Sequence, residues 1–449
     1  MTEILDELLE NLDSRQGPYN HLEAYASGTQ KLAWISPESR KAMGDRLTHL
    51  SSNIPSLLAN SIVERLRING FSDPRAWNVF TATDLDQLAP RAMLDSLIYG
   101  TGYVLVWTKA GKVVASVESP RQCAVLRDPA DRSVVAGVKR YTTKHDGTHA
   151  YLYLPDVIEH WRSPASGAAR NGFALVDQVV NPLGTVPLVP IENGYSEFRD
   201  VIPLTDALVK LLVDMMTASE AAGKPRRWIA GLEFVEKPRL DQDGNSVVDD
   251  NGEPIIDVVS PIDDVNTTQT MLSENADTKF GQLPASDLSG FKEGVQVIVS
   301  QLSAVSSLPA HYLSPLTAAQ VPSADGLRAA EASLIARCES KQLKFGRAFE
   351  QVARLLVALD TGQDPAGIDG LRVKWADAST RSVAQEADAA QKLYAAKILD
   401  RRSVLRTLGY TDDEIDTIVS SLTDEAKTNK DIERGRYMDD VLSYAGVPQ

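Results

Sequence analysis

The chain has few of the residues on which most enzymatic chemistry depends. Of its 449 residues, 2 are cysteine and 6 are histidine. Cys123 and Cys338 lie far apart and form no metal or redox spacing, so we expect both to be buried, reduced thiols of an intracellular protein. The chain contains no Gly-x-Ser-x-Gly, P-loop or His-Glu-x-x-His motif. The sequence therefore offers no assembled active site and predicts no cofactor or metal.

Long apolar runs and signal sequences are also lacking. The most apolar window, residues 295–309, is interrupted by glutamine and serine, whereas a membrane-spanning helix needs about 20 consecutive apolar residues. The N-terminus is acidic and does not have the basic-then-apolar order of a signal peptide. We therefore expect a soluble, non-secreted protein without a membrane partner.

The chain has fewer positively charged than negatively charged residues. The chain has 46 Lys and Arg against 61 Asp and Glu, for a formal net charge of −15. A protein that holds DNA tightly neutralises phosphates with clustered basic residues, so contact with nucleic acid is expected to be repulsive or local. Solubility is the more common explanation of such a charge. The length and the 43% hydrophobic content are sufficient for two to four domains with a real core.

The strongest pattern that is present lies in residues 306–360, where a proline-punctuated loop leads into a helix of about ten turns, roughly 50 Å long. The charged residues of this segment, among them Glu331, Lys341 and Glu350, are predicted on the face opposite the apolar stripe. The apolar residues recur at steps of three, four and seven and share one face of the helix: Leu327, Leu334, Cys338, Phe345, Phe349, Val352, Leu356 and Leu359.

The remaining periodicities predict an α+β, predominantly helical fold. Residues 1–100 read as helices, one of them from Ile54 to Leu66, and residues 103–153 read as short strands in one antiparallel meander. Two helices of similar length, 203–222 and 286–307, flank a small β or irregular insertion and predict a long helical hairpin. Gly290 and Gly294, one turn apart on the second helix, are spaced for close approach to a neighbouring helix.

Few local motifs of the sequence indicate a functional site. The acidic segment 240–254 begins like a calcium loop, but Ser246 and Gly252 stand where that loop needs glycine and glutamate, so a solvated hairpin tip is favoured. His145 and His149 are predicted to be exposed, and His311 to have no partner at a ligand spacing. The compact basic and aromatic cluster of Arg226, Arg227 and Trp228 could meet a partner protein, contact a phosphate or cover a core edge.

Taken in order, the parts resemble the portal proteins of tailed bacteriophages, in the branch common in phages of Gram-positive hosts. The resemblance is carried by segments spread over most of the chain: Tyr25-x-x-Gly28, Asn53 to Phe71, Asp95 to Trp107, Ser119-Pro120, Arg127-Asp128-Pro129, Val186-Pro187 with Asn193, Leu308-Pro309-x-His311-Tyr312-Leu313, Ser323 to Leu334, Lys374-Trp375-x-Asp377 and Ala387-Asp388.

The resemblance implies the architecture and the partners. Portal subunits form a ring, usually of twelve, at one capsid vertex, with a central channel for double-stranded DNA. They dock the terminase large subunit and head-completion or adaptor proteins, meet major capsid and scaffold proteins, and are not enzymes. Carried onto this chain, the resemblance implies the following parts: wing 1–202, stem helices 203–222 and 286–307, clip 223–285, tunnel loop 308–322, spine helix and wing completion 323–377, and crown 378–449.

Candidate functional residues follow from these parts. The segment YLSPLTAAQVPS carries no charge, which suits weak, sequence-blind contact with DNA, and we predict that Ser314, Thr317 and Gln320 face the channel. Arg226, Arg227 and Trp228 are the candidates for contact with partners of the clip. Two alternatives remain open at this stage: an acidic, helix-rich scaffold or adaptor that binds proteins only, and an enzyme with an unrecognised site.

Overall fold

The chain divides into two compact units, residues 1–378 and 379–449, and each is described here by itself. The computed structural model describes most of both units, with these ranges: 3–32, 52–223, 227–230, 235–239, 246–248, 252, 254–259, 277, 279–282, 289–313, 323–379, 383–410, 414–425 and 427. Helices and strands are mixed throughout the first unit, and the α+β, largely helical class predicted from the sequence is confirmed.

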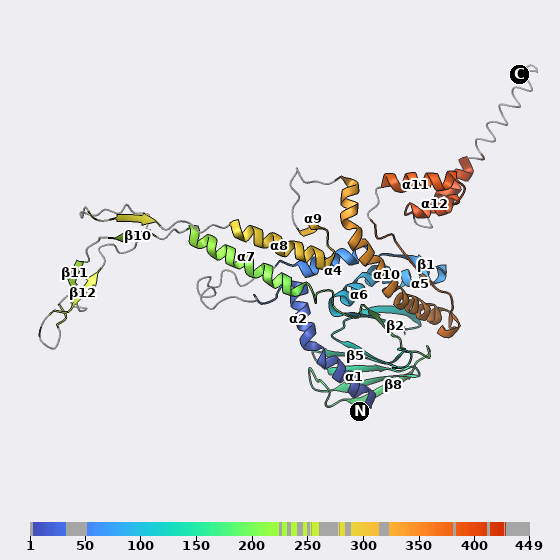
Figure 1. Ribbon diagram of the computed structural model, residues 1–449. Coiled ribbons are helices and arrows are strands. Elements are labelled where there is room, and N and C mark those ends of the chain that lie inside the picture. Colours follow the sequence, from blue (N-terminus) through green and yellow to red (C-terminus); the bar gives the residue numbers. More distant parts are fainter. Residues whose placement is uncertain are drawn as a thin grey trace, which may run out of the picture. The chain divides into compact units, whose positions relative to one another are not determined.

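The N-terminal helix α1 (Glu3–Ser14) lies on one face of a five-stranded antiparallel sheet (Figure 1). Its four buried leucines, at positions 5, 8, 9 and 12, pack against Val138, Leu152 and Trp161 of the sheet. Gly147, at φ +80°, opens the third strand after the Asp146 turn, where the positive φ suits glycine. The strands follow one another as a meander: β4 (Cys123–Arg127), β5 (Val134–Thr143), β6 (Gly147–Tyr153), β7 (Val157–Ser163) and β8 (Ala174–Val180).

A second sheet is formed by the strands on either side of this meander in the sequence. Strand β2 (Thr101–Lys109) lies between β3 (Lys112–Glu118) and β9 (Leu188–Glu192). The prediction of one continuous meander was therefore wrong. The chain changes sheets at the turn closed by Gln122 N–H donating to Ser119 C=O at 2.9 Å, next to a proline that ends strand pairing. The two sheets share a buried cluster that includes Tyr103, Tyr153 and Leu188.

The helices that precede the second sheet in the sequence pack on it and on one another. Helix α2 (Gln16–Ser27) precedes α4 (Ile54–Val63), α5 (Pro74–Ala82) and α6 (Leu85–Tyr99). The helix predicted to reach Leu66 ends at Val63, because Ile68–Phe71 forms strand β1 and pairs with β14 (Val373–Trp375). That partner lies about 300 residues further along the chain, so no local pattern could reveal it.

Asp95, on α6, is a partly buried carboxyl group. Burial raises the pKa of Asp95 to about 7; the charge of Arg91 opposes this rise and that of Glu23 adds to it. Because the folded pKa lies above the unfolded value of about 3.9, Asp95 contributes stability that is complete below pH ~4 and is lost as the pH rises through 7.

We therefore expect Asp95→Asn to be more stable than the parent at pH 8, by up to about 3 kcal/mol, and close to it at pH 4.5. Urea unfolding followed by tryptophan fluorescence between pH 4.5 and 8.5 measures the difference. A variant less stable than the parent at pH 8 would contradict the assignment. Asp86→Asn, an exposed position on the same helix, is the control and should show no such pH dependence.

The predicted helical hairpin is observed. Helix α7 (Ile202–Gly223) packs beside α8 (Ser289–Ser306), and the described residues between them in the sequence form four short strands (Figure 1). These strands make two antiparallel ribbons: β10 (Arg227–Ala230) with β13 (Lys279–Gln282), and β11 (Val235–Pro238) with β12 (Ile256–Val259). The short helix α9 (Ala310–Leu313) follows α8.

The long helix predicted from the sequence is α10 (Ala324–Thr361), which has 38 residues. Ser323 caps its start by accepting a hydrogen bond from Gly326 N–H at 3.2 Å, and Gly362 ends it in the left-handed conformation. Six residues of the predicted apolar stripe are buried in the main core: Leu334, Cys338, Phe345, Phe349, Val352 and Leu356. The 3₁₀ turn η3 (Pro365–Gly367) then leads to β14.

The second unit is helical. It contains α11 (Val383–Ala395), α12 (Arg401–Thr407) and a helical segment at residues 414–425. Asp400 caps α12 by accepting a hydrogen bond from Ser403 N–H at 3.2 Å. Short helices were predicted here, and helices are present. The predicted N-cap at residues 411–413 lies outside the described residues.

Candidate functional site at the junction of the long helix and the helical hairpin

Three charged residues of α10, predicted on the face opposite the apolar stripe, lie in the interior of the first unit. Glu331, Lys341 and Glu350 are buried. A buried charge is tolerated only when another charge or several hydrogen bonds compensate it. Each of these three residues meets a partner from another element, and together they attach the helix to the rest of the first unit.

The central attachment is built around Glu197, in the loop after β9. Its carboxylate has no exposed surface and forms ion pairs with Arg337 and Lys341, both from α10. Asn193 completes the cluster: its amide donates to Glu197 Oε1 at 2.8 Å, and its Oδ1 accepts from Lys341 Nζ at 2.5 Å. Two cations one helical turn apart thus hold one buried carboxylate.

The pKa values of Glu197 and Lys341 are both lowered, for different reasons. Burial alone would raise the pKa of Glu197, but the hydrogen bond from Lys341 and the charge of Arg337 outweigh it, so the pKa lies below its usual value. Burial, together with the nearby cations Lys344 and Arg337, lowers the pKa of the Lys341 ammonium, although Glu197 acts in the opposite direction. Each buried charge of the cluster meets an opposite charge or a hydrogen bond, as a structural attachment requires.

Arg337 also connects this cluster to the hairpin. Its Nη1 donates to the carbonyl oxygen of Ser306 at 2.8 Å and to that of Val305 at 3.3 Å. These are the last two residues of α8, whose carbonyl groups have no partner within the helix. A cation at the C-terminal end of a helix also interacts favourably with the helix dipole. One arginine therefore joins α8, α10 and the loop after β9.

A second attachment lies near the start of α10. Arg65, which follows α4, donates to Tyr312 Oη at 2.9 Å and lies 3.3 Å from Glu331. The Tyr312 hydroxyl lies 3.3 Å from Glu331, and His311 Nε2 lies 4.0 Å from the same carboxylate. His311, for which no partner at a ligand spacing was predicted, lies near this one carboxylate. Helix α9, which carries both aromatic residues, is tied to α10 within the first part of the predicted tunnel loop, 308–322.

The third attachment holds the C-terminal half of α10. Arg372 Nη1 lies 3.0 Å from the Glu350 carboxylate, which also accepts a hydrogen bond from Val373 N–H at 3.4 Å. Val373 belongs to β14, so this contact ties α10 to the two-stranded sheet with β1. Gly346 lies against the same strand, since a Cβ there would come within 3.2 Å of Val373 Cγ1.

The two helices of the hairpin pack closely along their length. A Cβ on Gly294 would come within 2.9 Å of Leu211 Cδ2, so the absence of a side chain there lets α8 approach α7. Gly290 has no atom within 4 Å of such a Cβ, and of the two predicted glycines only Gly294 makes the close approach. Tyr25 Oη donates to Asp206 Oδ1 at 2.7 Å and ties α7 to α2.

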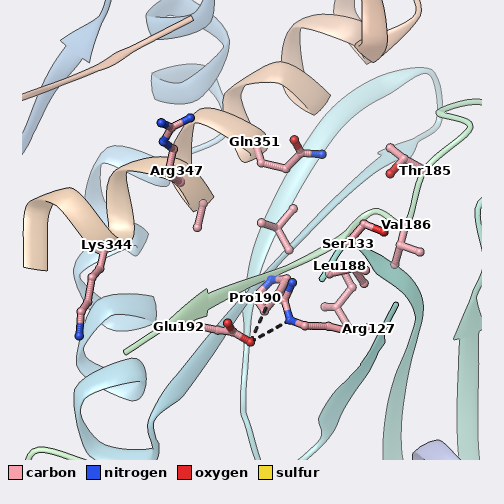
Figure 2. A pocket seen from close by; sticks show the side chains of 13 residues that line it. Arg127, Ser133, Thr185, Val186, Leu188, Pro190, Glu192, Lys344, Arg347 and Gln351 are labelled. Atoms are coloured by element: carbon pink, nitrogen blue, oxygen red, sulfur yellow. Dashed lines mark hydrogen bonds and ion pairs between the residues drawn. The ribbon is translucent and has the colours of Figure 1, made fainter. Parts of the chain in front are cut away.

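A surface hollow of about 470 Å³ lies between α10, β9 and the turn that connects β4 to β5 (Figure 2). Arg127 and Glu192 form an ion pair at 3.0 Å in it. Lys344 and Arg347, both from α10, also line it (Figure 2). Apolar side chains, such as Val186 and Leu188, line its floor. Nothing in this arrangement resembles a nucleophile with its base, and the hollow suits packing better than catalysis.

A cluster of stacked rings occupies the face of the five-stranded sheet opposite α1. His149, predicted to be exposed, is buried; its ring stacks on Tyr141, and its Nδ1 lies 3.0 Å from His160 Nε2. Burial, and then the neighbouring His149, lowers the pKa of His160. Within the described ranges, no group of three or more His, Cys, Asp and Glu residues could hold a metal ion. No described helix is long and apolar enough to cross a membrane.

The structure describes only some of the residues that were predicted to be functional. Ser314, Thr317, Gln320 and Arg226 lie outside the described residues. Arg227 and Trp228 lie on β10, opposite Gln282 and Gly281 of β13. These two of the predicted clip residues therefore belong to the two-stranded ribbon that follows α7 in the sequence. Sequence reasoning missed Glu197, because a lone glutamate in a loop carries no signal of burial.

The comparisons with known proteins agree with this architecture. A family model described as phage portal protein, SPP1 Gp6-like, matches residues 65–431. The portal protein of Mycobacterium phage L5 is 29% identical over 404 residues, which cover 83% of this chain and 78% of the relative. The portal protein of Mycobacterium phage D29 is 29% identical over 391 residues, covering 80% and 76%.

A solved structure is also similar. It is a chain from the virion of a native gene transfer agent particle, with a TM-score of 0.44 and 14% sequence identity, covering 87% of this chain and 98% of that chain. The family model alone spans well over half of the sequence. The resemblance found in the sequence is confirmed, and the chain belongs to the phage portal protein family of the SPP1 Gp6-like type.

Proposed function

We propose that copies of this chain form a ring, of twelve subunits, at one vertex of a phage capsid, and that double-stranded DNA passes through its central channel during packaging and ejection. Membership of the portal family supports this proposal. The observation that carries it is the hairpin of α7 and α8, whose base is fixed to the wing by the Arg337 and Glu197 junction. A channel wall under load needs such a rigid attachment.

The parts of the chain receive their roles under this proposal. Residues 1–202, completed by 323–377, are the wing, and the helices 203–222 and 286–307 are the stem. Residues 223–285 are the clip, 308–322 the tunnel loop and 378–449 the crown. The support is the order of elements: two long helices enclose small ribbons, and the long helix begins directly after the loop.

Contact with DNA is proposed to be weak and independent of base sequence. The net charge of −15 opposes tight phosphate binding, which would stall a moving duplex. Ser314, Thr317 and Gln320 are proposed to face the channel, because the loop that holds them offers only uncharged side chains. Uncharged hydrogen-bonding groups can follow a backbone without holding it.

The partners are proposed from the family. The clip, with Arg226, Arg227 and Trp228, would dock the terminase large subunit during packaging and a head-completion or adaptor protein afterwards. Major capsid and scaffold proteins would meet the wing, with assembly in the host cytoplasm and the ring retained in the virion. Hydrolysis of ATP would be the task of the terminase, and this chain would carry out no catalytic step.

The ring is tested by its mass and symmetry. Size-exclusion chromatography with light scattering on the purified full chain is expected to give a mass of about twelve chains, and negative-stain images should show radial symmetry around a central hole. A mass of one or two chains in the presence of capsid and scaffold proteins would reject the ring. That result would favour the acidic adaptor considered from the sequence, which the family assignment otherwise argues against.

A further inference from the structure

Strand β8 is the last strand of the five-stranded sheet, and it is exposed along its whole length. All 7 of its residues are exposed. Four of them are aliphatic: Leu175 is 46% exposed, Val176 56%, Val179 44% and Val180 81%. Aliphatic side chains at this density on a sheet edge indicate a surface that is covered in the working assembly.

Both hydrophobic layers of the sheet reach β8 and end there in solvent. Leu175 is opposite Trp161, which belongs to the layer under α1, and Val179 is opposite Ile158, which belongs to the layer between the two sheets. One more strand beside β8 would therefore extend two existing cores at once. It would also satisfy the outer row of backbone N–H and C=O groups.

The usual protections of a sheet edge are weak here. Natural edge strands carry lysine, proline or an inward charge that prevents pairing with other chains. Strand β8, with the sequence ALVDQVV, has one charged residue, Asp177, and no lysine or proline. Asp177 lies opposite His160 of β7 and, among the described residues, forms no ion pair within 4 Å.

The other wing-sheet edges differ in accessibility. Strand β4 begins with buried Cys123 and Ala124, and β9 lies against α10. Strand β3 is the accessible one: Val114 is exposed on it, beside a hollow of about 290 Å³ lined in part by Leu105 and Trp107. Its tip carries Lys112, which is exposed and, within the described ranges, forms no ion pair. The β3 edge is thus apolar and basic where β8 is apolar and acidic.

We propose that, in the ring, β8 of each subunit adds to the β3 edge of the neighbouring copy, with Asp177 facing Lys112. The inference rests on the proposed ring. Pairing β8 with β8 would be two-fold and would close at two copies, whereas pairing two different edges of one chain continues from subunit to subunit and can close as a ring. Unlike charges at the two edges fix which edges meet and oppose like-with-like pairing.

A charge swap in the full-length chain tests this pairing. Asp177→Lys and Lys112→Glu are each expected to raise the protein concentration needed for half-maximal ring assembly at least tenfold, measured by mass photometry. The double variant, which restores opposite charges, should return to within about threefold of the parent. Val180→Lys, at the most exposed position, should weaken assembly without changing the melting temperature of the monomer.

Matched controls reverse charges elsewhere. Lys144→Glu and Asp369→Lys, both at exposed positions away from the two edges, should assemble as the parent does. If the parent forms rings and the Asp177 and Lys112 variants assemble equally well, the edge pairing is overturned and the proposed function stands. If the double variant does not recover, the contact of Asp177 with Lys112 is overturned. If the parent forms no ring even in the presence of capsid and scaffold proteins, the proposed function itself fails.

Discussion

Replacing Lys341 by methionine is expected to lower the free energy of unfolding of the first unit by about 3 kcal/mol. Methionine keeps most of the length of the side chain, so the loss reports on the charge. The variant leaves the fully buried carboxylate of Glu197 with Arg337 and Asn193 alone. Removing one partner of a buried ion pair costs roughly 3–5 kcal/mol, and the remaining arginine places this case at the lower end.

Urea unfolding of the parent and the variant measures the loss. Lys210→Met is the matched control, because Lys210 pairs with Asp214 on α7 with both side chains about one-third exposed; its cost should stay below about 1 kcal/mol. Adding Glu197→Gln to Lys341→Met should recover part of the loss, since the unpaired charge is removed. A loss under about 1 kcal/mol for Lys341→Met would show that the cluster is not a strong attachment.

The same cluster gives a pH dependence with a definite sign. The folded pKa of Glu197 lies below its unfolded value, which is about 4.3. Its contribution to stability is therefore present above pH ~4.3 and is lost as the pH falls through the lower folded pKa. The difference between the parent and Lys341→Met should shrink in acid, which is opposite to the behaviour expected at Asp95.

Substituting Gly102 by alanine is expected to destabilise the first unit by about 3 kcal/mol or more. A Cβ at this position would lie 2.1 Å from the carbonyl oxygen of Ala92 and 3.3 Å from the backbone nitrogen of Ser96. Both atoms belong to the backbone of α6, so no side-chain rotation can relieve the clash. The helix would have to move away from β2, which opens the core between Met93, Leu97 and Val104.

Thermal unfolding and soluble yield of Gly102→Ala measure this effect. Gly17→Ala is the matched control, since Gly17 lies within α2 and a Cβ there meets nothing within 4 Å. That substitution should be neutral or stabilise by up to about 1 kcal/mol through better helix propensity. Equal stability of the parent and Gly102→Ala would mean that α6 and β2 are not in the close contact described here.

The helices could be predicted from the sequence because their signals are local. The start of α10 at Ala324, the end of α6 before Gly100 and the two hairpin helices all follow from periodicity with caps nearby. The division of the strands into two sheets and the pairing of β1 with β14 could not be predicted. These features depend on partners far away in the sequence, and the residues themselves are equally suited to either arrangement.

The attachments of α10 could not be predicted from the sequence either, for a different reason. Periodicity assigns a charged residue to the solvent side, and only a partner from another element reverses that assignment. Lys341 is buried because Glu197 and Asn193 meet it, and neither is near it in the sequence. The channel and clip candidates remain predictions of the family resemblance.

The contacts of Glu331 have a consequence for the length of the predicted tunnel loop. His311 and Tyr312, near the start of that loop, meet the side chain of Glu331, which lies two turns into the helix that follows it. The two ends of the intervening chain are thus joined by side chains, and the entropy of closing that segment depends only logarithmically on its length. Doubling the number of residues would cost about 0.6 kcal/mol, so selection can vary the length of the segment with little penalty to the stability of the first unit.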